Sequence, residues 1–144
     1  MGRRLHIQLI QLLDRQCLLR GNEIATIDGT QRRSWSEMKD RVARLAAGLV
    51  DLGIGRGDRV AILALNSHRY MGAIFAIASC GAVVVPLNTR LAPPEIQFML
   101  EDGGARAVFA DEGFISLSQS LQKKLTALEH AIYMADVLER PDTL

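Results

Sequence analysis

The segment from Asp58 to Leu91 constrains the fold more than any other part of the chain. It contains two short apolar runs, residues 59–65 and 82–87, separated by a helical stretch over residues 68–80. A run rich in Val, Ile and Leu is typical of a central parallel strand that is buried on both faces. Two such strands joined by a helical crossover form a βαβ unit. The segment therefore predicts a parallel sheet.

Further elements are predicted on both sides of this unit. Ser34 and Glu37 form a capping-box signature that starts a helix, and Gly53 is placed to end that helix in the left-handed conformation. Asp28 and Gly29 are a strong two-residue hairpin signal. The remaining predicted elements are a helix over residues 5–19, strands over 23–27 and 31–33, a helix over 93–102, a strand over 106–110, a helix from Ser116 or Ser118 to Leu128, and a strand over 130–134.

These elements predict an α/β fold, in which a mostly parallel sheet of the flavodoxin-like βαβ type carries helices on both faces. A short N-terminal β-hairpin is added to it. The chain of 144 residues is the size of one domain. Within that single domain we expect an N-terminal helix (1–20), an α/β core (23–135) and a tail without clear structure (136–144).

Composition excludes several classes of function. The net charge of +1 provides no strong field that would attract nucleic acid. The longest apolar stretch, residues 71–87, is interrupted by Ser79 and Gly81, so we expect no membrane span, and no signal peptide is evident. The three histidines are scattered, which predicts no metal site. Cys17 and Cys80 are expected to be buried, reduced thiols of a cytoplasmic protein.

Three glycines between residues 53 and 57 allow two interpretations. A phosphate-binding loop needs its glycines after a strand and at the start of a helix, so that helix N–H groups meet the phosphate. Here the glycines follow a predicted helix and precede a predicted strand. That order favours an ordinary turn.

Polar residues follow the second strand of the βαβ unit. Open α/β sheets bind ligands outside the carboxyl ends of their strands, which makes Arg90 the best candidate for ligand binding. A guanidinium suits a phosphate. The alternative is a surface or structural arginine that pairs with Glu95 or Asp111. Asn88 either braces its loop or contacts a ligand.

The first strand of the unit is followed by Asn66 and Ser67, for which helix capping is the simpler interpretation. His68 is predicted to be exposed in the first turn of the next helix. Trp35 belongs to an apolar helix stripe and is predicted to lie in the core. Ala92 starts a helix without a side-chain cap.

Several motifs, taken in their order and spacing, resemble one family. They are Ser34-Trp35-Ser36-Glu37-Met38, then Arg44 to Leu49, Gly57 to Ile62, Gly81 to Leu91 and Pro94-Glu95-Ile96. This series is similar to the N-terminal portion of the AMP-forming acyl-CoA synthetases, which are adenylate-forming ligases. The similarity runs from about Glu23 to Asp111.

The resemblance implies a two-step reaction in the complete enzyme, in which Mg·ATP activates a fatty-acid or related carboxylate and coenzyme A takes the acyl group. It implies that Arg90, with Asn88, lies at the rim of the coenzyme A site. The family's phosphate loop, adenine-binding segment, ribose-binding Asp and catalytic Lys are absent between Met1 and Leu144. We therefore expect an N-terminal fragment with no catalytic residue and no cofactor of its own, inactive alone.

Two other functions stay open. The chain could be a stand-alone binding or regulatory module for a coenzyme A-like ligand or a partner protein. It could also be a flavodoxin-like nucleotide binder, although no glycine loop is correctly placed for that. The expected partners are downstream ligase domains and, through uncovered apolar surface, a second copy of the chain.

Overall fold

The computed structural model describes residues 8–135, so residues 5–7 of the predicted first helix and the predicted tail over 136–144 lie outside it. The chain divides into two compact units. Unit 1 comprises Met1–Asp58 and Met71–Val84, and unit 2 comprises Arg59–Tyr70 and Val85–Leu144. The expectation of one domain over 1–144 stays a prediction. Among the described helices, none is long and apolar enough to cross a membrane.

Unit 1 begins with two helices and a hairpin. Its elements are α1 (Leu9–Arg20), β1 (Ile24–Asp28), β2 (Gln31–Ser34) and α2 (Trp35–Asp51). Helix α1 contacts α2, where Lys39 Nζ lies 2.9 Å from Asp14 Oδ1, and Leu13 is fully buried. Asp28 pairs with Gln31 in the antiparallel hairpin, so its two loop residues are Gly29 and Thr30. The predicted Asp28-Gly29 loop was therefore wrong by one residue; Gly29 has the positive φ that this turn requires.

Helix α2 is bounded as the sequence predicts. Ser34 Oγ accepts the Glu37 N–H at 3.2 Å, and Glu37 Oε2 accepts the Ser34 N–H at 2.7 Å. This completes the capping box and holds the pKa of Glu37 below its ordinary value. At the other end Gly53 has φ 79°, and Ile54 N–H donates to Leu49 O at 2.9 Å, as in a Schellman motif. Trp35 is only half-buried, contrary to the prediction, because it lies in the first turn of the helix.

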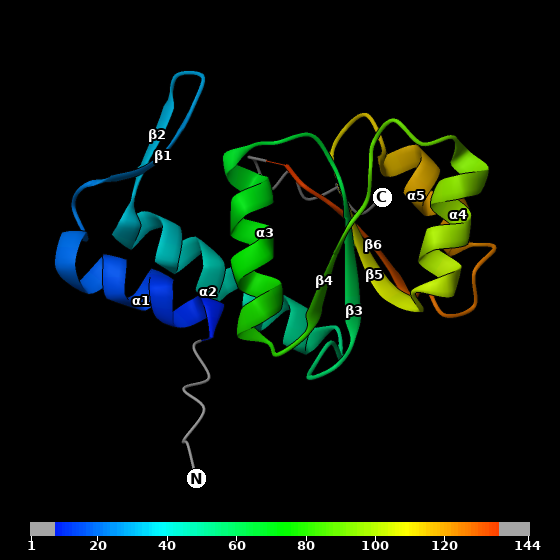
Figure 1. The fold of residues 1–144 in the computed structure, drawn as a ribbon, viewed down its shortest axis with the longest axis horizontal. Helices are drawn as coiled ribbons and strands as arrows, with labels where there is room; N and C mark the ends of the chain where they lie inside the picture. The colour runs from blue at the N-terminus through cyan, green and yellow to red at the C-terminus, as the bar shows by residue number, and fades with distance from the viewer. Residues whose placement is uncertain (1–7, 136–144) are drawn as a thin grey trace, which may run out of the picture. The chain divides into compact units, whose positions relative to one another are not determined.

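A parallel sheet organises the second half of the chain (Figure 1). Its four strands are arranged in the order β4-β3-β5-β6, and β3 pairs parallel with β5 as β5 does with β6. This confirms the predicted α/β fold, a parallel sheet flanked by helices with a separate hairpin. The elements are β3 (Arg59–Leu63), α3 (His68–Ser79), β4 (Val83–Pro86), α4 (Pro93–Asp102), β5 (Ala105–Ala110), α5 (Ile115–Gln122) and β6 (His130–Tyr133).

The core of unit 2 lies between one face of the sheet and helices α4 and α5. Leu63 and Val108 on the strands cluster with Ile96 and Leu100 of α4 and Leu121 of α5. Burial of these side chains is the main stabilising term of the unit. The neighbours that alternate with them on β3 and β5, which are Val60, Ile62, Ala107 and Phe109, are buried as well. Both faces of these strands are covered, as their continuous apolar runs predict.

Helix α5 is shorter than its leucine spacing predicts. It ends at Gln122, whereas the sequence predicted a helix to Leu128. The following residues form turns, in which Lys124 N–H donates to Leu121 O and Leu128 N–H donates to Leu125 O. Leu125 and Leu128 are nevertheless buried. Successive turns bring them to the core at the same spacing, so periodicity alone did not distinguish the two structures.

Candidate functional site

Three loops of unit 2 leave the sheet at its carboxyl end. They follow β3 (residues 64–67), β4 (87–92) and β5 (111–114). In each loop a polar side chain accepts a backbone N–H, a contact that short polar side chains commonly make in turns and at helix starts. These contacts fix the loop backbone and thereby the positions of the neighbouring side chains.

The loop after β3 is held by Ser67. Its Oγ accepts the Tyr70 N–H at 3.2 Å, which confirms the predicted cap of α3. His68 is 8% exposed, so the prediction of an exposed histidine was wrong. In the first turn of α3, His68 is buried, whereas Arg69 and Tyr70 are half-buried and Met71 is exposed.

The loop after β4 is held by Asn88. Its Oδ1 accepts the Arg90 N–H at 3.0 Å, so Asn88 braces the loop as one of its two interpretations predicted. Arg90 itself is exposed. The carboxylate of Glu95 accepts the Ala92 N–H, and within residues 8–135 Arg90 forms no ion pair with Glu95 or Asp111. The pairing with Glu95 or Asp111 is therefore not observed, an exposed surface arginine is in keeping with the alternative, and ligand binding by Arg90 and Asn88 stays a prediction.

Asp111 joins the loops after β3 and β5. Its Oδ2 accepts the Leu65 N–H at 2.8 Å, and its Oδ1 accepts the Gly113 N–H at 3.1 Å. Sequence reasoning considered Asp111 only as a partner of Arg90 and missed this role. The signal was present in its position directly after a buried strand and two residues before a glycine, which is typical of an Asp that closes its own turn.

The hydrogen bond between Asp111 and Leu65 lies where the order of the strands in the sheet reverses. From β3 the chain continues to β4 on one side, whereas β5 lies on the other side of β3 and leads on to β6. The carboxyl ends of β3 and β5 therefore flank the topological switch point, where open α/β sheets commonly bind ligands. The Asp111 carboxylate bridges the two loops at this point. A flavodoxin-like nucleotide binder would bind a phosphate here, where this chain has a negatively charged side chain.

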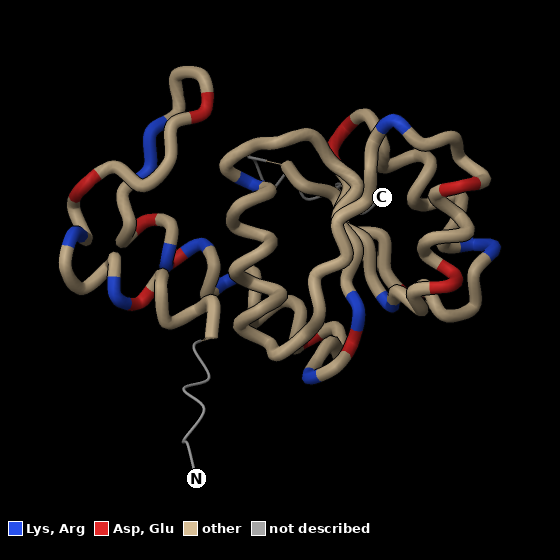
Figure 2. Tube along the Cα trace, in the orientation of Figure 1, with Lys and Arg blue, Asp and Glu red and all other residues tan. Residues whose placement is uncertain are grey.

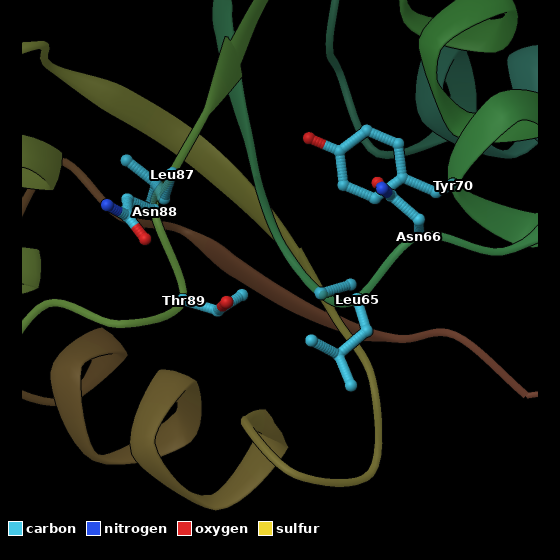
Figure 3. Close-up of a pocket in the computed structure, with 7 residues that line it drawn as sticks. Leu65, Asn66, Tyr70, Leu87, Asn88 and Thr89 are labelled. Carbon is cyan, nitrogen blue, oxygen red and sulfur yellow. The ribbon is translucent and has the colours of Figure 1, made fainter.

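A pocket of about 230 Å³ lies beside the switch point, between the loops after β3 and β4. Figure 3 shows Asn66 and Tyr70 on one side of it and Asn88 and Thr89 on the other. The pocket brings together Asn66 and Asn88, which the sequence analysis treated separately, and adds Tyr70 and Thr89, which it missed. The full lining is Ala64, Leu65, Asn66, Tyr70, Leu87, Asn88 and Thr89.

The groups in this pocket are uncharged. Its polar side chains are carboxamides and hydroxyls, and burial raises the pKa of Tyr70 above its ordinary value, so this phenol, neutral at pH 7 in any case, stays neutral further into the alkaline range. Within residues 8–135, no three His, Cys, Asp or Glu side chains are gathered that could hold a metal ion. A triphosphate with Mg²⁺ needs cations and carboxylate ligands, so these residues do not by themselves fit Mg·ATP.

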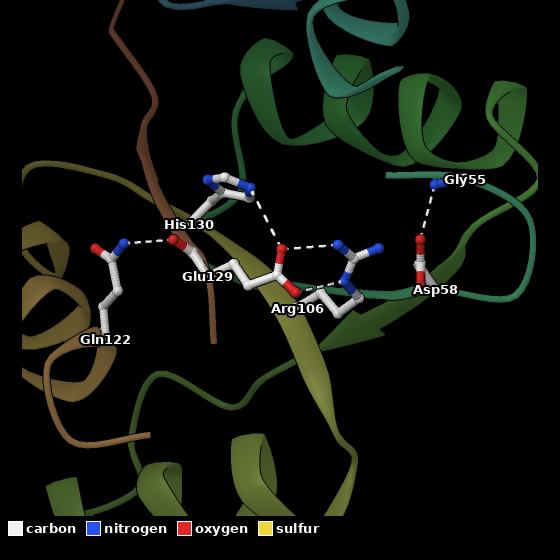
Figure 4. Close-up of polar contacts among 6 residues, drawn as sticks. All are labelled: Gly55, Asp58, Arg106, Gln122, Glu129 and His130. Carbon is white, nitrogen blue, oxygen red and sulfur yellow. Dashed lines mark hydrogen bonds and ion pairs between the residues drawn. The ribbon is translucent and has the colours of Figure 1, made fainter. Parts of the chain in front are cut away.

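Charged residues at the amino end of the sheet are engaged with one another (Figure 4). Arg106 donates from Nε and Nη2 to the two carboxylate oxygens of Glu129, at 2.9 and 2.7 Å. His130 Nε2 lies 3.8 Å from Glu129 Oε2, and Gln122 Nε2 donates to Glu129 O. Elsewhere acidic and basic residues are interspersed along the chain (Figure 2), in keeping with the net charge of +1.

The two cysteines are free and only half-buried, whereas the sequence analysis expected buried thiols. Cys80 Sγ donates to Ala46 O at 3.4 Å, and burial raises the pKa of its thiol. Cys17 Sγ lies 3.7 Å from Ser36 Oγ. Both therefore contact helix α2.

Known proteins are similar to this chain in sequence and in fold. A long-chain-fatty-acid–CoA ligase of Thermus thermophilus is 35% identical over 103 residues, which make up 72% of this chain and 19% of the relative. The anthranilate CoA ligase AuaEII, in complex with anthranoyl-AMP, is 27% identical with a TM-score of 0.85 over 91% of this chain and 25% of its own. The N-terminal domain of FACL13 from Mycobacterium tuberculosis is 28% identical with a TM-score of 0.80 over 88% of this chain and 34% of its own.

The chain thus spans about a fifth (19%) of the length of the curated Thermus relative. The model of the AMP-binding enzyme family matches residues 13–143, which is nearly the whole chain. Together with the parallel sheet and its ligase neighbours, this match shows that the chain belongs to the AMP-binding enzyme family.

Proposed function

We propose that the chain is the N-terminal part of an acid–CoA ligase. In the reaction, a carboxylate oxygen attacks the α-phosphorus of ATP, pyrophosphate leaves, and the thiol of coenzyme A then displaces AMP from the acyl adenylate. The observation that carries the proposal is the family match over residues 13–143. The ligase names of its relatives, and the anthranoyl-AMP bound by one of them, support the same chemistry.

The acid is a fatty acid or a related carboxylate in this proposal, which places the protein in fatty-acid metabolism. The Thermus relative is a long-chain-fatty-acid ligase, whereas AuaEII is an anthranilate ligase. Because both are similar to this chain, its residues leave the choice between an aliphatic and an aryl acid open. A panel that includes acetate, palmitate and benzoate, tested on the complete enzyme, would separate the classes.

We propose further that these 144 residues do not catalyse adenylation alone. The developing charge on a transferring phosphoryl group must be neutralised by cations and N–H donors. The pocket presents only uncharged groups, and Lys39 is paired with Asp14 far along the chain from it. Pyrophosphate release from Mg·ATP should stay at background with every acid of the panel. Measurable turnover by the purified chain would contradict this part of the proposal.

The gene supplies an independent test of the parent enzyme. We expect the reading frame after Leu144 to encode a Ser/Thr/Gly-rich phosphate loop that ends in Pro-Lys-Gly. A stop codon directly after Leu144 would contradict a ligase parent and would favour the alternative, a stand-alone module that binds a coenzyme A-like ligand or a partner protein.

Arg90 and Asn88 are proposed to form part of the coenzyme A site. Arg90 is exposed on a loop that Asn88 holds in place, at the carboxyl end of β4. Isothermal titration calorimetry with coenzyme A is the test, because Arg90→Ala should abolish most of the heat of binding. Equal heats for the wild type and Arg90→Ala would remove Arg90 from the site.

The same loops disfavour a flavodoxin-like nucleotide binder. The Asp111 carboxylate at the switch point would repel a phosphate placed there. Thermal-shift assays with FMN and with adenine nucleotides should therefore show no stabilisation. A shift of several degrees with FMN would contradict this reasoning.

Self-association and a cytoplasmic location remain proposals. Unit 1 exposes apolar side chains on α1 and β1, chiefly Leu12, Leu18, Leu19 and Ile27, which supports association with a second copy. Downstream ligase domains are the other proposed partner. Light scattering at high micromolar concentration should give the mass of a dimer, and a monomer would contradict the proposal. The two unpaired cysteines are consistent with the cytoplasm.

A further inference from the structure

The outer face of helix α4 presents an aromatic ring among carboxylates. Phe98 is 65% exposed, although the same helix buries Ile96 and Leu100 in the core of unit 2. Residues three before Phe98 and three and four after it are its neighbours on the helix surface. All of these neighbours are exposed acids, namely Glu95, Glu101 and Asp102.

Two of these acids stand at the unfavourable end of the helix. Glu101 and Asp102 lie in the last turn of α4, where the helix dipole favours cations. That turn contains no basic residue, and within residues 8–135 neither carboxylate forms an ion pair. A local rule that is broken without compensation is typical of surfaces that serve a function.

Helix α1 carries a surface of the opposite charge. Leu12, Arg15 and Leu19 are spaced by three and four residues, so they share one face of the helix, and Leu18 extends that face. All four side chains are exposed, and Leu18 is 85% exposed. In the described part of the chain Arg15 forms no ion pair, whereas the neighbouring acid, Asp14, is paired with a lysine.

The two faces complement each other. A guanidinium stacked on a phenyl ring gains cation–π attraction, and Arg15 placed on Phe98 would also meet the carboxylates beside the ring. The leucines of α1 would cover the rest of the ring and so remove apolar surface from water on both sides. Neither face fits itself, because like charges would then be placed together.

We propose that α4 of one copy of the chain binds α1 of a second copy, with Arg15 on Phe98 and its neighbouring carboxylates. This inference rests on the self-association proposed above and names the surfaces that perform it. Each copy carries both faces. Two copies that exchange the contact in both directions therefore form a closed dimer.

Charge reversal on one face at a time tests the pairing. The double variant Glu101→Arg/Asp102→Arg blocks α4, and Arg15→Glu blocks α1. In sedimentation-velocity experiments at high micromolar concentration the wild type should be a dimer, and each variant alone should dissociate at least about tenfold more readily. An equal mixture of the two variants should form a mixed dimer, because in it every acidic face meets a basic one.

Further variants separate this contact from general charge and from misfolding. Glu112→Arg and Arg56→Glu reverse exposed charges outside both helices and should leave the dimer unchanged. Phe98→Ala should weaken the dimer about tenfold, as loss of a central aromatic contact predicts. Arginine suits the last turn of a helix, so Glu101→Arg/Asp102→Arg should unfold at the same or higher urea concentration as dilute monomer.

The outcomes distinguish this inference from the proposals on which it rests. If the wild type is a dimer that neither charge reversal weakens, the pairing of α4 with α1 is overturned and self-association stands. If each variant is a monomer and the mixture is too, the pairing is likewise overturned, because the faces then contact another part of the second copy. A monomeric wild type overturns both and leaves the two faces to downstream ligase domains. The ligase proposal is tested separately by the acids.

Discussion

The two ends of the sheet in unit 2 use polar residues in different ways. At the amino end, charged side chains engage one another or the backbone: Arg106 is bidentate on Glu129, and Arg59 Nε donates to Gly103 O at 2.9 Å. At the carboxyl end, the pocket between the loops after β3 and β4 is lined by uncharged groups. Charge near a strand is therefore a poor guide to function when the charge is already paired.

The largest effect is expected at the amino end, from Gly104→Ala. Gly104 has φ 57°, and a Cβ there would meet Arg59 Nη2 at 2.5 Å. The left-handed conformation costs about 1–2 kcal/mol for alanine, and displacing Arg59 forfeits its bond to Gly103, about 1 kcal/mol more. We expect the free energy of unfolding, measured with urea, to fall by roughly 2–3 kcal/mol.

Gly113→Ala is the matched control, because Gly113 lacks a positive φ and its added Cβ would only touch Asp111 Oδ1 at 3.5 Å. It should change the free energy of unfolding by less than about 1 kcal/mol. If both variants lose the same free energy of unfolding, the positive φ of Gly104 does not require glycine.

Asp111→Ala is expected to have the second-largest effect on stability. It removes the carboxylate that joins the loops after β3 and β5. It leaves the Leu65 and Gly113 N–H groups without their acceptor. We expect a loss of about 2 kcal/mol in the free energy of unfolding, with faster hydrogen exchange at Leu65. Glu112→Ala, the exposed neighbour, should be nearly neutral. If Leu65 exchange stays slow in Asp111→Ala, Asp111 does not hold the loop.

Arg106→Ala should cost less, about 1 kcal/mol, because the pair with Glu129 is partly exposed. Arg106→Lys keeps the charge but loses the two-pronged geometry, so it should recover only part of the loss. Urea denaturation at low and high salt measures both variants. Full recovery by lysine would mean that charge alone matters at this end of the sheet.

The smallest effect concerns Tyr70 and alkaline pH. Burial raises the pKa of Tyr70 above 10.0 in the folded chain, so the neutral hydroxyl is favoured there. The stability that this provides is present below the unfolded pKa and is lost as pH rises through the folded pKa. Relative to Tyr70→Phe, the wild type should lose stability only above about pH 10 in urea titrations. Parallel pH profiles for the two proteins would contradict this.

How much the sequence predicts differs between these regions. The continuous apolar run of β3 and the capping box at Ser34 act through neighbouring residues, and both are found where the sequence predicts them. Tyr70 and Asp111 were missed because their roles depend on which strand ends are neighbours. Asp111 meets Leu65 across 46 positions of sequence only because β5 lies beside β3. Strand order is a tertiary property that no local pattern encodes.

Three further expectations stay predictions: self-association, ligand binding by Arg90 and the limits of the domain. Each concerns a surface that the chain presents outward, and the apolar and polar patterns used here report mainly what faces inward. Sequence reasoning erred at His68 because packing buries a side chain whose local context predicts exposure. At the end of α5 it predicted the buried leucines but not the turns that carry them.

The pairing of β3 with β5 has a consequence for how the chain folds as it is made. Arg59 pairs with Ala105, so β3 emerges from the ribosome well before its partner. At about 5–20 residues per second, the interval of 46 residues lasts roughly two to nine seconds. During that time an apolar strand has no β5 to join. Such non-local pairing raises contact order, so we expect slow refolding and a nascent chain that relies on chaperones until residue 110 has appeared.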